Sequence, residues 1–249
     1  SWVRQFMETT LPDATIVETN TFYEGDRYTT AQHRETLKVN GWTDFTTVDI
    51  TDEEGTVMLP VRGGKWLTEM SVGSHLKNYD SLVVLTHFKG HVMGGFGGSN
   101  KNIGIGCADG RIGKGMIHSK DGDDWGTTQE ELMEKITEST KATIDFFGSH
   151  VTYINVLRNI SVSCDCEGVD AEPVVTPNIG ILASTDILAA DAASVDMIHA
   201  LNAVDQQDFL DVQLQSTQRL LHHTDVRGEI DRYEQFLKER RACDTYRVI

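Results

Sequence analysis

The segment from residue 87 to residue 118 constrains this chain most, because it combines unusual backbone freedom with many polar side chains. Glycine lacks a Cβ atom, so it can adopt positive φ angles and let the main chain approach a ligand closely. The glycines concerned are Gly90, Gly94, Gly95, Gly97, Gly98, Gly104 and Gly106. The groups able to bind ligands or transfer protons are His87, Lys89, His91, Asn100, Lys101, Asn102, Cys107, Lys114 and His118. If the chain has an active site, we expect it in this segment.

The net charge of the chain limits the classes of molecule that we expect it to bind. The 249-residue chain carries 22 Lys and Arg against 38 Asp and Glu, a formal net charge of −16. Such a field repels phosphate backbones and anionic lipids, so we expect neither nucleic acid nor a membrane surface as a partner. No apolar run approaches the roughly 18 residues of a membrane span. A locally basic pocket inside the acidic shell is still compatible with the sequence, lined by Lys89, Lys101, Arg111 and Lys114.

The cysteines, Cys107, Cys164, Cys166 and Cys243, do not form the pattern of a secreted disulfide framework. Reduced thiols are typical of cytoplasmic proteins, so we expect a cytoplasmic location. The chain begins Ser-Trp-Val-Arg without an initiator methionine, inside a predicted helix, and we therefore expect a segment before it. The sequence leaves the oligomeric state open.

Hydrophobic periodicity predicts alternating helices and strands. Helices are predicted over residues 2–10, 30–39, 127–147, 186–203, 206–222 and 228–241. Strands are predicted over residues 14–19, 45–50, 56–61, 81–86, 151–157 and 179–183. The unbroken apolar centre of 81–86 is typical of a strand covered on both faces. With no internal repeat or linker, the alternation indicates a single compact α/β domain, with a layered mixed or mostly parallel sheet flanked by helices.

The glycine spacing matches neither standard nucleotide motif. The dinucleotide-binding pattern Gly-x-Gly-x-x-Gly can start at Gly95 or at Gly104. Its third glycine is replaced in both cases, by Asn100 in the first and by Asp109 in the second. The run that starts at Gly110 is one element too short for a phosphate loop and lacks Ser or Thr after its lysine. Consecutive amides around Gly94–Gly98 can still form a nest for a phosphate, with a nearby lysine as counter-charge. The alternative is a purely structural glycine-rich crossover.

Three histidines in this segment are candidates for chemistry. His87 and His91 stand four residues apart, a spacing that places both imidazoles on one side of a helix, although Gly90 disfavours a regular helix there. Metal ligation by His87 and acid–base catalysis by His91 are both consistent with the pair. His118 ends the same segment and is a second candidate for proton transfer.

Cys164 and Cys166 lie in a polar turn after the predicted strand 151–157. A Cys-x-Cys pair can ligate a soft metal or a cluster, but two thiolates do not complete a site. Cys107 is a candidate third ligand or cofactor contact by chemical type alone. The spacing does not match that of a ferredoxin, and small buried thiols are the alternative interpretation.

Asp191 falls inside the apolar stripe of the predicted helix 186–203. An unpaired buried charge is unfavourable, so we expect Asp191 to be paired, protonated or directed at a ligand. The simpler alternative is a hydrogen bond from a backbone amide or a loop hydroxyl.

The run His-Phe-Lys-Gly-His…Gly-Phe-Gly-Gly-x-x-Lys-Asn-x-Gly-x-Gly-Cys…Gly-Lys…His over residues 87–118 closely resembles domain-of-unknown-function family 362. Members are often labelled uncharacterised iron–sulfur centre proteins. Residues 20–27 with His33, residues 155–166 and residues 179–191 resemble the family's further blocks.

The resemblance implies a link to redox chemistry, because many relatives carry a ferredoxin-like insertion with two 4Fe–4S clusters after the histidine that matches His118. Here only residues 120–126 stand at that place, so we do not expect a 4Fe–4S cluster in this chain. The family pattern also implies a β-strand before residue 1.

We therefore expect an oxidoreductase-like protein that binds a phosphate-bearing redox cofactor, with a flavin type as the leading choice. The residues expected to bind it are Lys89, Gly94, Gly95, Gly97, Gly98, Lys101, Asn102 and Cys107. Catalytic roles are assigned to His91, His118 and Asp191, and a metal, if one binds, to His87, Cys164 and Cys166. An external electron-transfer protein is a further expected partner. The alternative is a non-catalytic metal-binding or electron-transfer module.

Overall fold

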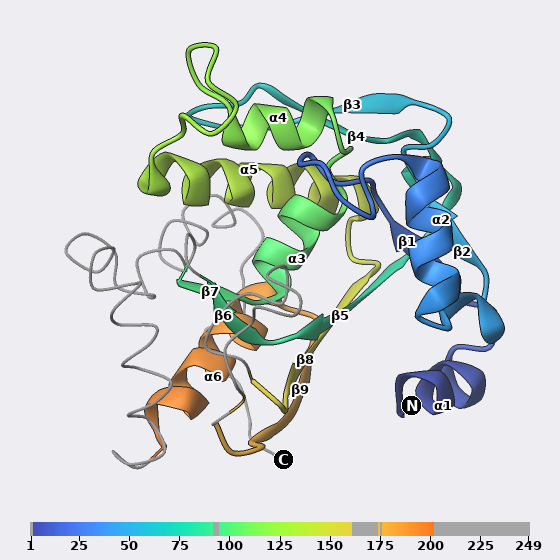
Figure 1. Ribbon diagram of the computed structural model, residues 1–249. Coiled ribbons are helices and arrows are strands. Elements are labelled where there is room, and N and C mark those ends of the chain that lie inside the picture. Colours follow the sequence, from blue (N-terminus) through green and yellow to red (C-terminus); the bar gives the residue numbers. More distant parts are fainter. Residues whose placement is uncertain (1, 92–94, 161–173, 175, 202–249) are drawn as a thin grey trace.

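The computed structural model describes residues 2–91, 95–160, 174 and 176–201 (Figure 1). The predicted helices over 206–222 and 228–241 lie outside these residues, as do Gly94, Cys164 and Cys166.

Helices and strands are both present along the described chain, in short runs of each, which confirms the predicted α/β class. The helices are α1 (Trp2–Thr10), α2 (Thr30–Val39), α3 (Ser99–Gly106), α4 (Ile112–His118), α5 (Gln129–Phe147) and α6 (Ile187–His199), with short 3-10 helices η1 (Trp42–Asp44) and η2 (Ser74–Asn78). The strands are β1 (Ile16–Glu18), β2 (Val48–Ile50), β3 (Thr56–Pro60), β4 (Glu69–Gly73), β5 (Leu82–His87), β6 (Lys89–His91), β7 (Gly95–Gly97), β8 (Val151–Leu157) and β9 (Gly180–Ser184).

Strands β5, β8 and β9 form the largest sheet in the described part, in that order. Strand β8 runs parallel to β5 and antiparallel to β9, so this sheet is mixed. Parallel neighbours need a long crossover connection, and α3, α4 and α5 all lie in the connection between β5 and β8. The smaller pairs are β1–β2, which is parallel, and β3–β4 and β6–β7, which are antiparallel. The predicted layered sheet with flanking helices is confirmed.

Helices α3 and α6 pack on the same face of this sheet. Asn155 in β8 hydrogen-bonds both Ser99 at the start of α3 and Asp191 in α6, so both helices cover the face to which Asn155 points. On the opposite face Val83 is 38% exposed and Ile181 is 51% exposed. The prediction that β5 is covered on both faces is therefore wrong for the described residues, because its covering helix lies on one side only.

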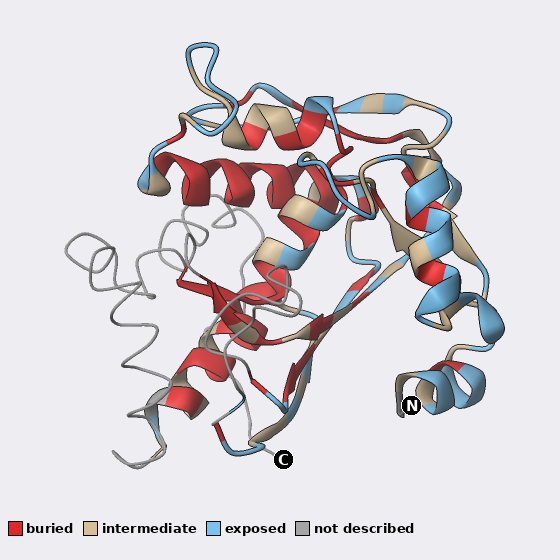
Figure 2. Ribbon diagram, in the orientation of Figure 1, coloured by how far each residue is buried: buried red, intermediate tan, exposed pale blue. Residues whose placement is uncertain are grey.

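Helix α5 lies in a second helical layer. It packs against α3 on one side and against α4 and the β3–β4 hairpin on the other (Figure 1). Enclosed in this way, it is buried continuously from Glu131 to Ile144 (Figure 2). The helix begins after Thr128, whose hydroxyl accepts a hydrogen bond from the Glu131 amide at 3.4 Å, a typical N-cap arrangement.

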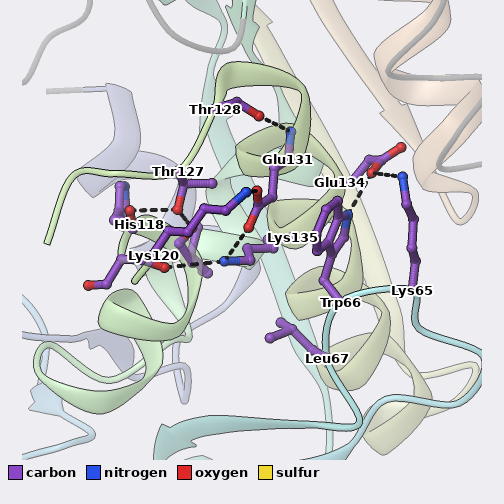
Figure 3. Close-up of polar contacts among 12 residues, drawn as sticks. Lys65, Trp66, Leu67, His118, Lys120, Thr127, Thr128, Glu131, Glu134 and Lys135 are labelled. Carbon is purple, nitrogen blue, oxygen red and sulfur yellow. Dashed lines mark hydrogen bonds and ion pairs between the residues drawn. The ribbon is translucent and has the colours of Figure 1, made fainter. Parts of the chain in front are cut away.

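Glu131 is a buried carboxylate on α5 with two lysine partners. Its oxygens lie 2.6 Å from Nζ of Lys120 and 3.0 Å from Nζ of Lys135 (Figure 3). Opposing charges at such distances compensate for the unfavourable transfer of a carboxylate out of water. The pairing joins α5 to the loop that follows α4.

Glu134 and Glu138 hold the segment between β3 and β4 against α5. Glu134 accepts hydrogen bonds from Nζ of Lys65 at 2.9 Å and from Nε1 of Trp66 at 2.6 Å (Figure 3). Glu138 is fully buried and accepts from the backbone amides of Lys65, Trp66 and Leu67 at 2.8, 3.1 and 2.7 Å. A polar helix can therefore occupy the interior because its carboxylates satisfy donors on the neighbouring layer.

The main hydrophobic core lies around these layers and includes Met70 and Val72 of β4, Val84 of β5, Ile103 of α3 and Ile136 of α5. Among the described residues, no helix combines the length and the apolar character that crossing a bilayer requires.

Replacing Glu138 with alanine should remove the acceptor of three buried amides. Each buried donor left without a partner costs about 1–3 kcal/mol, so we expect the free energy of unfolding to fall by at least about 3 kcal/mol. Urea denaturation measures this change. Glu35→Ala on the exposed side of α2 is the matched control and should change stability by less than about 0.5 kcal/mol. Equal stability of the two variants would contradict the assigned role of Glu138.

Candidate functional site

The glycine-rich segment folds into a hairpin followed by a helix. Strand β6 pairs antiparallel with β7, and His91 lies opposite Gly95. Gly95 has a φ of +73°, a conformation that residues with a Cβ atom rarely adopt. Gly98 follows β7 and directly precedes the first turn of α3. The chain therefore reverses at the hairpin and delivers α3 to the sheet.

Asp191 caps the N-terminus of α3 from another helix. Its carboxylate accepts hydrogen bonds from the amides of Ser99 at 2.8 Å and Asn100 at 2.9 Å, and from Nδ2 of Asn155 at 2.8 Å. A Cβ atom on Gly98 would lie only 2.6 Å from Oδ1 of Asp191, so this approach requires glycine. Burial raises the pKa of Asp191, and these three hydrogen bonds oppose the rise.

This cap lies directly after the Gly94–Gly98 segment, around which a phosphate nest was predicted. Helix N-termini attract anions because their first amides lack partners and the helix dipole is positive there. At α3 the protein supplies the anion itself, so the amides of Ser99 and Asn100 already have an acceptor. The geometry favours the backbone hydrogen-bond alternative for Asp191, and its catalytic role stays a prediction.

Two lysines of the predicted phosphate site lie together beside the hairpin. A Cβ atom placed on Gly97 would be 3.5 Å from Cγ of Lys89 and 3.6 Å from Cδ of Lys101, so both side chains pass next to Gly97. Lys89 also donates from Nζ to the carbonyl of His87 at 3.3 Å. Strand β6 and helix α3 thus bring the aliphatic stems of two lysine side chains to the same glycine.

His118, at the end of α4, lies near enough to Lys101 for the lysine charge to affect its pKa. Its Nδ1 lies 2.8 Å from the carbonyl of Lys114 and must carry the proton that this acceptor requires, which leaves the lone pair of the neutral ring on Nε2. Burial is the main cause that lowers the pKa of His118, and the charges of Lys101, Lys114 and His91 lower it further. His91, Lys101 and His118, predicted from separate parts of the segment, therefore lie close enough to influence one another.

The predicted metal ligand His87 has another partner for one of its nitrogens. Nε2 of His87 lies 2.8 Å from the carbonyl of Arg158 and 3.1 Å from that of Asn159, so it donates to backbone oxygens. A nitrogen that carries a proton cannot bind a metal. Cys164 and Cys166, the other predicted ligands, lie outside the described residues.

Asn102 in α3 and Cys107 directly after α3 differ in their exposure to solvent. Asn102 is exposed and donates from Nδ2 to Oγ1 of Thr86 at 3.0 Å. Cys107 is buried in the main hydrophobic core, and burial raises the pKa of its thiol to about 12. A thiol in this state is a poor nucleophile at neutral pH, so the geometry favours the buried-thiol interpretation for Cys107.

A buried polar cluster next to α4 contains residues to which sequence reasoning assigned no role. Nζ of Lys114 donates to Oγ1 of Thr19 at 2.8 Å and to the carbonyl of Asn20. Asp52 accepts from the Asn20 amide at 3.1 Å and from the Gly110 amide at 2.8 Å. The cluster ties the loop after β1 to α4. Its members come from distant segments, and no local spacing could have revealed it.

His33 completes this cluster and is fully buried. Its Nδ1 lies 3.3 Å from Oδ1 of Asn20, an acceptor, so Nδ1 carries the proton. Nε2 has no hydrogen-bond partner in the part of the chain that the structure describes, and it lies 4.0 Å from Oε2 of Glu18. Burial lowers the pKa of His33 to about 4, and nearby Arg27 and Lys114 add to the effect. Burial likewise lowers the pKa of Lys114 to about 8.

Asp49, Glu53 and His75 are the one set of potential metal ligands that comes together among the described residues, with ligand atoms within 4.8 Å of one another. Their charges are already compensated. His75 contacts Asp49 at 2.8 Å and Glu54 at 3.2 Å through its two nitrogens, which raises its pKa, and Arg34 contacts Glu53 at 2.6 Å. The groups that would have to bind a metal ion thus already contact one another or Arg34.

Removing the Asp191 carboxylate should be far more damaging than removing an ordinary helix cap. Asp191→Ala leaves three buried donors without an acceptor, and we expect a loss of at least about 3 kcal/mol in the free energy of unfolding. Asp186, the N-cap of α6, accepts from the Ala189 amide at 2.9 Å and is the matched control. Its replacement by alanine should cost about 1 kcal/mol. Similar losses in urea denaturation for both variants would rule out the special role of Asp191.

His33 should make stability depend on pH between about 6.5 and 4. Because its pKa is lower in the folded state, folding binds fewer protons there, so its contribution is complete above pH 6.5 and is lost as the pH falls toward 4. The total effect is on the order of 3 kcal/mol. Urea denaturation across this range should show a shallower pH dependence for His33→Asn than for the unmodified protein. The exposed His150→Asn variant should retain the original profile, and a His33 variant with the same slope would refute the assignment.

Comparison with known protein families gives a match that includes the motifs of this site. No curated protein matches the chain. A family model described as a domain of unknown function, DUF362, matches residues 2–196. This match covers most of the chain, including the hairpin, α3, α4 and the capping carboxylate of α6. The protein therefore belongs to the DUF362 family of domains of unknown function.

Proposed function

We propose that this protein binds an anionic, phosphate-bearing small molecule beside the β6–β7 hairpin and acts as an oxidoreductase-like protein with a flavin-type cofactor. The observation that carries the proposal is that two lysine side chains pass beside one glycine in a chain of net charge −16. The stems of Lys89 and Lys101 flank Gly97, and Lys101 is near enough to His118 to affect its titration. A phosphate is the ordinary partner of such a group of cations.

The lysine side chains, rather than the N-terminus of α3, are the proposed contacts of the phosphate. The first amides of α3 bind Asp191, so an incoming anion finds no unpaired amide at Ser99 or Asn100. Lysine ammonium groups offer three donors each and adjust to a phosphate without a fixed geometry. This refines the expected nest around the glycines into a site defined by Lys89 and Lys101.

His118 is the proposed proton-transfer group. Its lowered pKa keeps the imidazole neutral at pH 7, and the hydrogen bond from Nδ1 to Lys114 directs the basic lone pair to Nε2. A neutral imidazole of fixed tautomer can accept a proton from a bound ligand. A flavin would supply the electron-accepting ring, and an external protein would exchange electrons with it.

The alternative is a metal-binding or electron-transfer module. Its candidate ligands Cys164 and Cys166 lie outside the described residues. His87 donates from Nε2 to backbone carbonyls, and a histidine that ligates a metal through its other nitrogen commonly makes such a bond. Elemental analysis together with an absorption spectrum separates the proposals, because stoichiometric metal without an organic chromophore would favour this alternative.

Lys101→Ala should weaken binding of flavin mononucleotide by at least about tenfold, the equivalent of about 1.4 kcal/mol. The reason is the loss of one ammonium group next to the phosphate. Titration of flavin fluorescence measures the dissociation constant. Lys38→Ala removes the same charge from the exposed surface of α2 and serves as the control, because Lys38 has only a solvent-exposed contact with Glu35.

An unchanged titration for Lys101→Ala, or an equal change for Lys38→Ala, would remove Lys101 from the site. Native mass spectrometry of gently purified protein provides an independent readout, since it reports the mass of any retained organic ligand. If neither flavin binding nor a phosphate-bearing ligand is detected with the unmodified protein, the proposed function is wrong.

A further inference from the structure

Three rings from different segments meet at the end of α4. The ring of Phe22, in the loop after β1, stacks on His118 with a centroid distance of 5.9 Å and an interplanar angle of 14°. Trp125, in the loop between α4 and α5, packs edge-on against both, at 5.1 Å from His118 and 5.4 Å from Phe22. We call these three residues the aromatic cluster. Its two hydrocarbon-rich rings, those of Phe22 and Trp125, contact the His118 imidazole that is proposed to transfer protons.

The aromatic cluster leaves a large apolar ring surface open to solvent. Trp125 is 50% exposed, and neighbouring Tyr23 is 42% exposed. An exposed tryptophan alone needs no explanation, but here it packs against His118, a partly buried histidine whose pKa is lowered by burial and by the charge of Lys101. Exposed aromatic surface next to converging polar groups is typical of a ligand site.

The loop that carries Trp125 is held in a defined conformation. Lys120 and Asp123 exchange backbone hydrogen bonds at 2.8 and 2.9 Å, and Gly122 between them has a φ of +85°. The amide of Trp125 donates to Oδ1 of Asp123 at 2.9 Å. A ring fixed in this way loses little conformational freedom when a ligand stacks on it.

Phe22 is also positioned closely. A Cβ atom on Gly115 would lie 3.4 Å from Cε2 of Phe22, so the glycine lets this ring lie directly on α4, one turn before His118. The loop bearing Phe22 is anchored at its start by Asn20, through Lys114 and Asp52. The buried polar cluster therefore determines where the aromatic cluster lies.

We propose that the aromatic cluster is a stacking platform for a planar, uncharged ring of the ligand, whose anionic group occupies a separate arm that reaches Lys89 and Lys101. The inference rests on the proposed function and adds the chemical class of the ligand. Asp121, Asp123 and Asp124 next to Trp125 disfavour a negative charge on the ring itself. A ring and an anionic arm at two neighbouring subsites match this distribution of charge.

The test measures binding of three probes by isothermal titration calorimetry: flavin mononucleotide, riboflavin, and glycerol phosphate, which has the phosphate without a ring. Trp125→Leu keeps apolar bulk but removes the stacking surface. We expect it to weaken flavin mononucleotide and riboflavin by about tenfold. Glycerol phosphate should bind both proteins equally, because it does not reach the platform.

Two further variants separate stacking from damage to the fold. Trp125→Phe retains a ring and should restore binding to within about threefold of the unmodified protein. Trp42→Leu removes a tryptophan of η1 that packs on Phe45, and it should leave binding of all probes unchanged. Thermal unfolding of each variant confirms that it is folded under the titration conditions.

The outcomes distinguish this inference from the proposed function. If Lys101→Ala weakens flavin mononucleotide but Trp125→Leu behaves like Trp42→Leu, the platform is refuted and the phosphate site remains. If riboflavin binding depends on Trp125 while Lys101→Ala has no effect, the platform remains and the phosphate site is refuted. If no probe binds the unmodified protein, both are wrong for flavin-type ligands.

Discussion

The hydrogen bonds of the Asp191 carboxylate are the interaction on which the rest of the structure depends. They join α6 to the first amides of α3 and to Asn155 of β8, so one buried anion connects two helices and the central sheet. Because an unpaired buried carboxylate is strongly unfavourable, this carboxylate and its donors must keep a fixed relative position. The position of α3 then determines where Lys101 lies.

The buried carboxylates of α5, in the second helical layer, also need partners. Helix α5 is enclosed by α3, α4 and the β3–β4 hairpin, yet it carries Glu131, Glu134 and Glu138 into the interior. Glu131 and Glu134 have lysine and indole donors (Figure 3), and Glu138 has backbone donors. Buried carboxylates are therefore ion-paired or hydrogen-bonded locally. The side-chain stems of Lys89 and Lys101 pass beside Gly97, and the charge of Lys101 acts on His118.

Regular elements with strong periodicity could be predicted, and positions that depend on distant partners could not. The helix ending at Phe147 and the strand Val151–Leu157 were predicted at their observed bounds or within a residue or two. The helices α3 and α4 were missed, because their sequences are rich in glycine and only tertiary contacts such as the Asp191 cap stabilise α3. The exposed face of β5 was also missed, since an apolar run does not report on which side a helix packs.

The sequence by itself determined the α/β class, the family and the segment in which the candidate groups occur, because local propensity, periodicity and motif spacing are properties of neighbouring residues. Only the tertiary structure decided how those groups are used. It placed Asp191 on the first amides of α3, buried Cys107, and brought Phe22 and Trp125 to His118. The physical reason is that burial and pairing are set by segments far apart in the chain, and these two quantities decide which polar group stays available for chemistry.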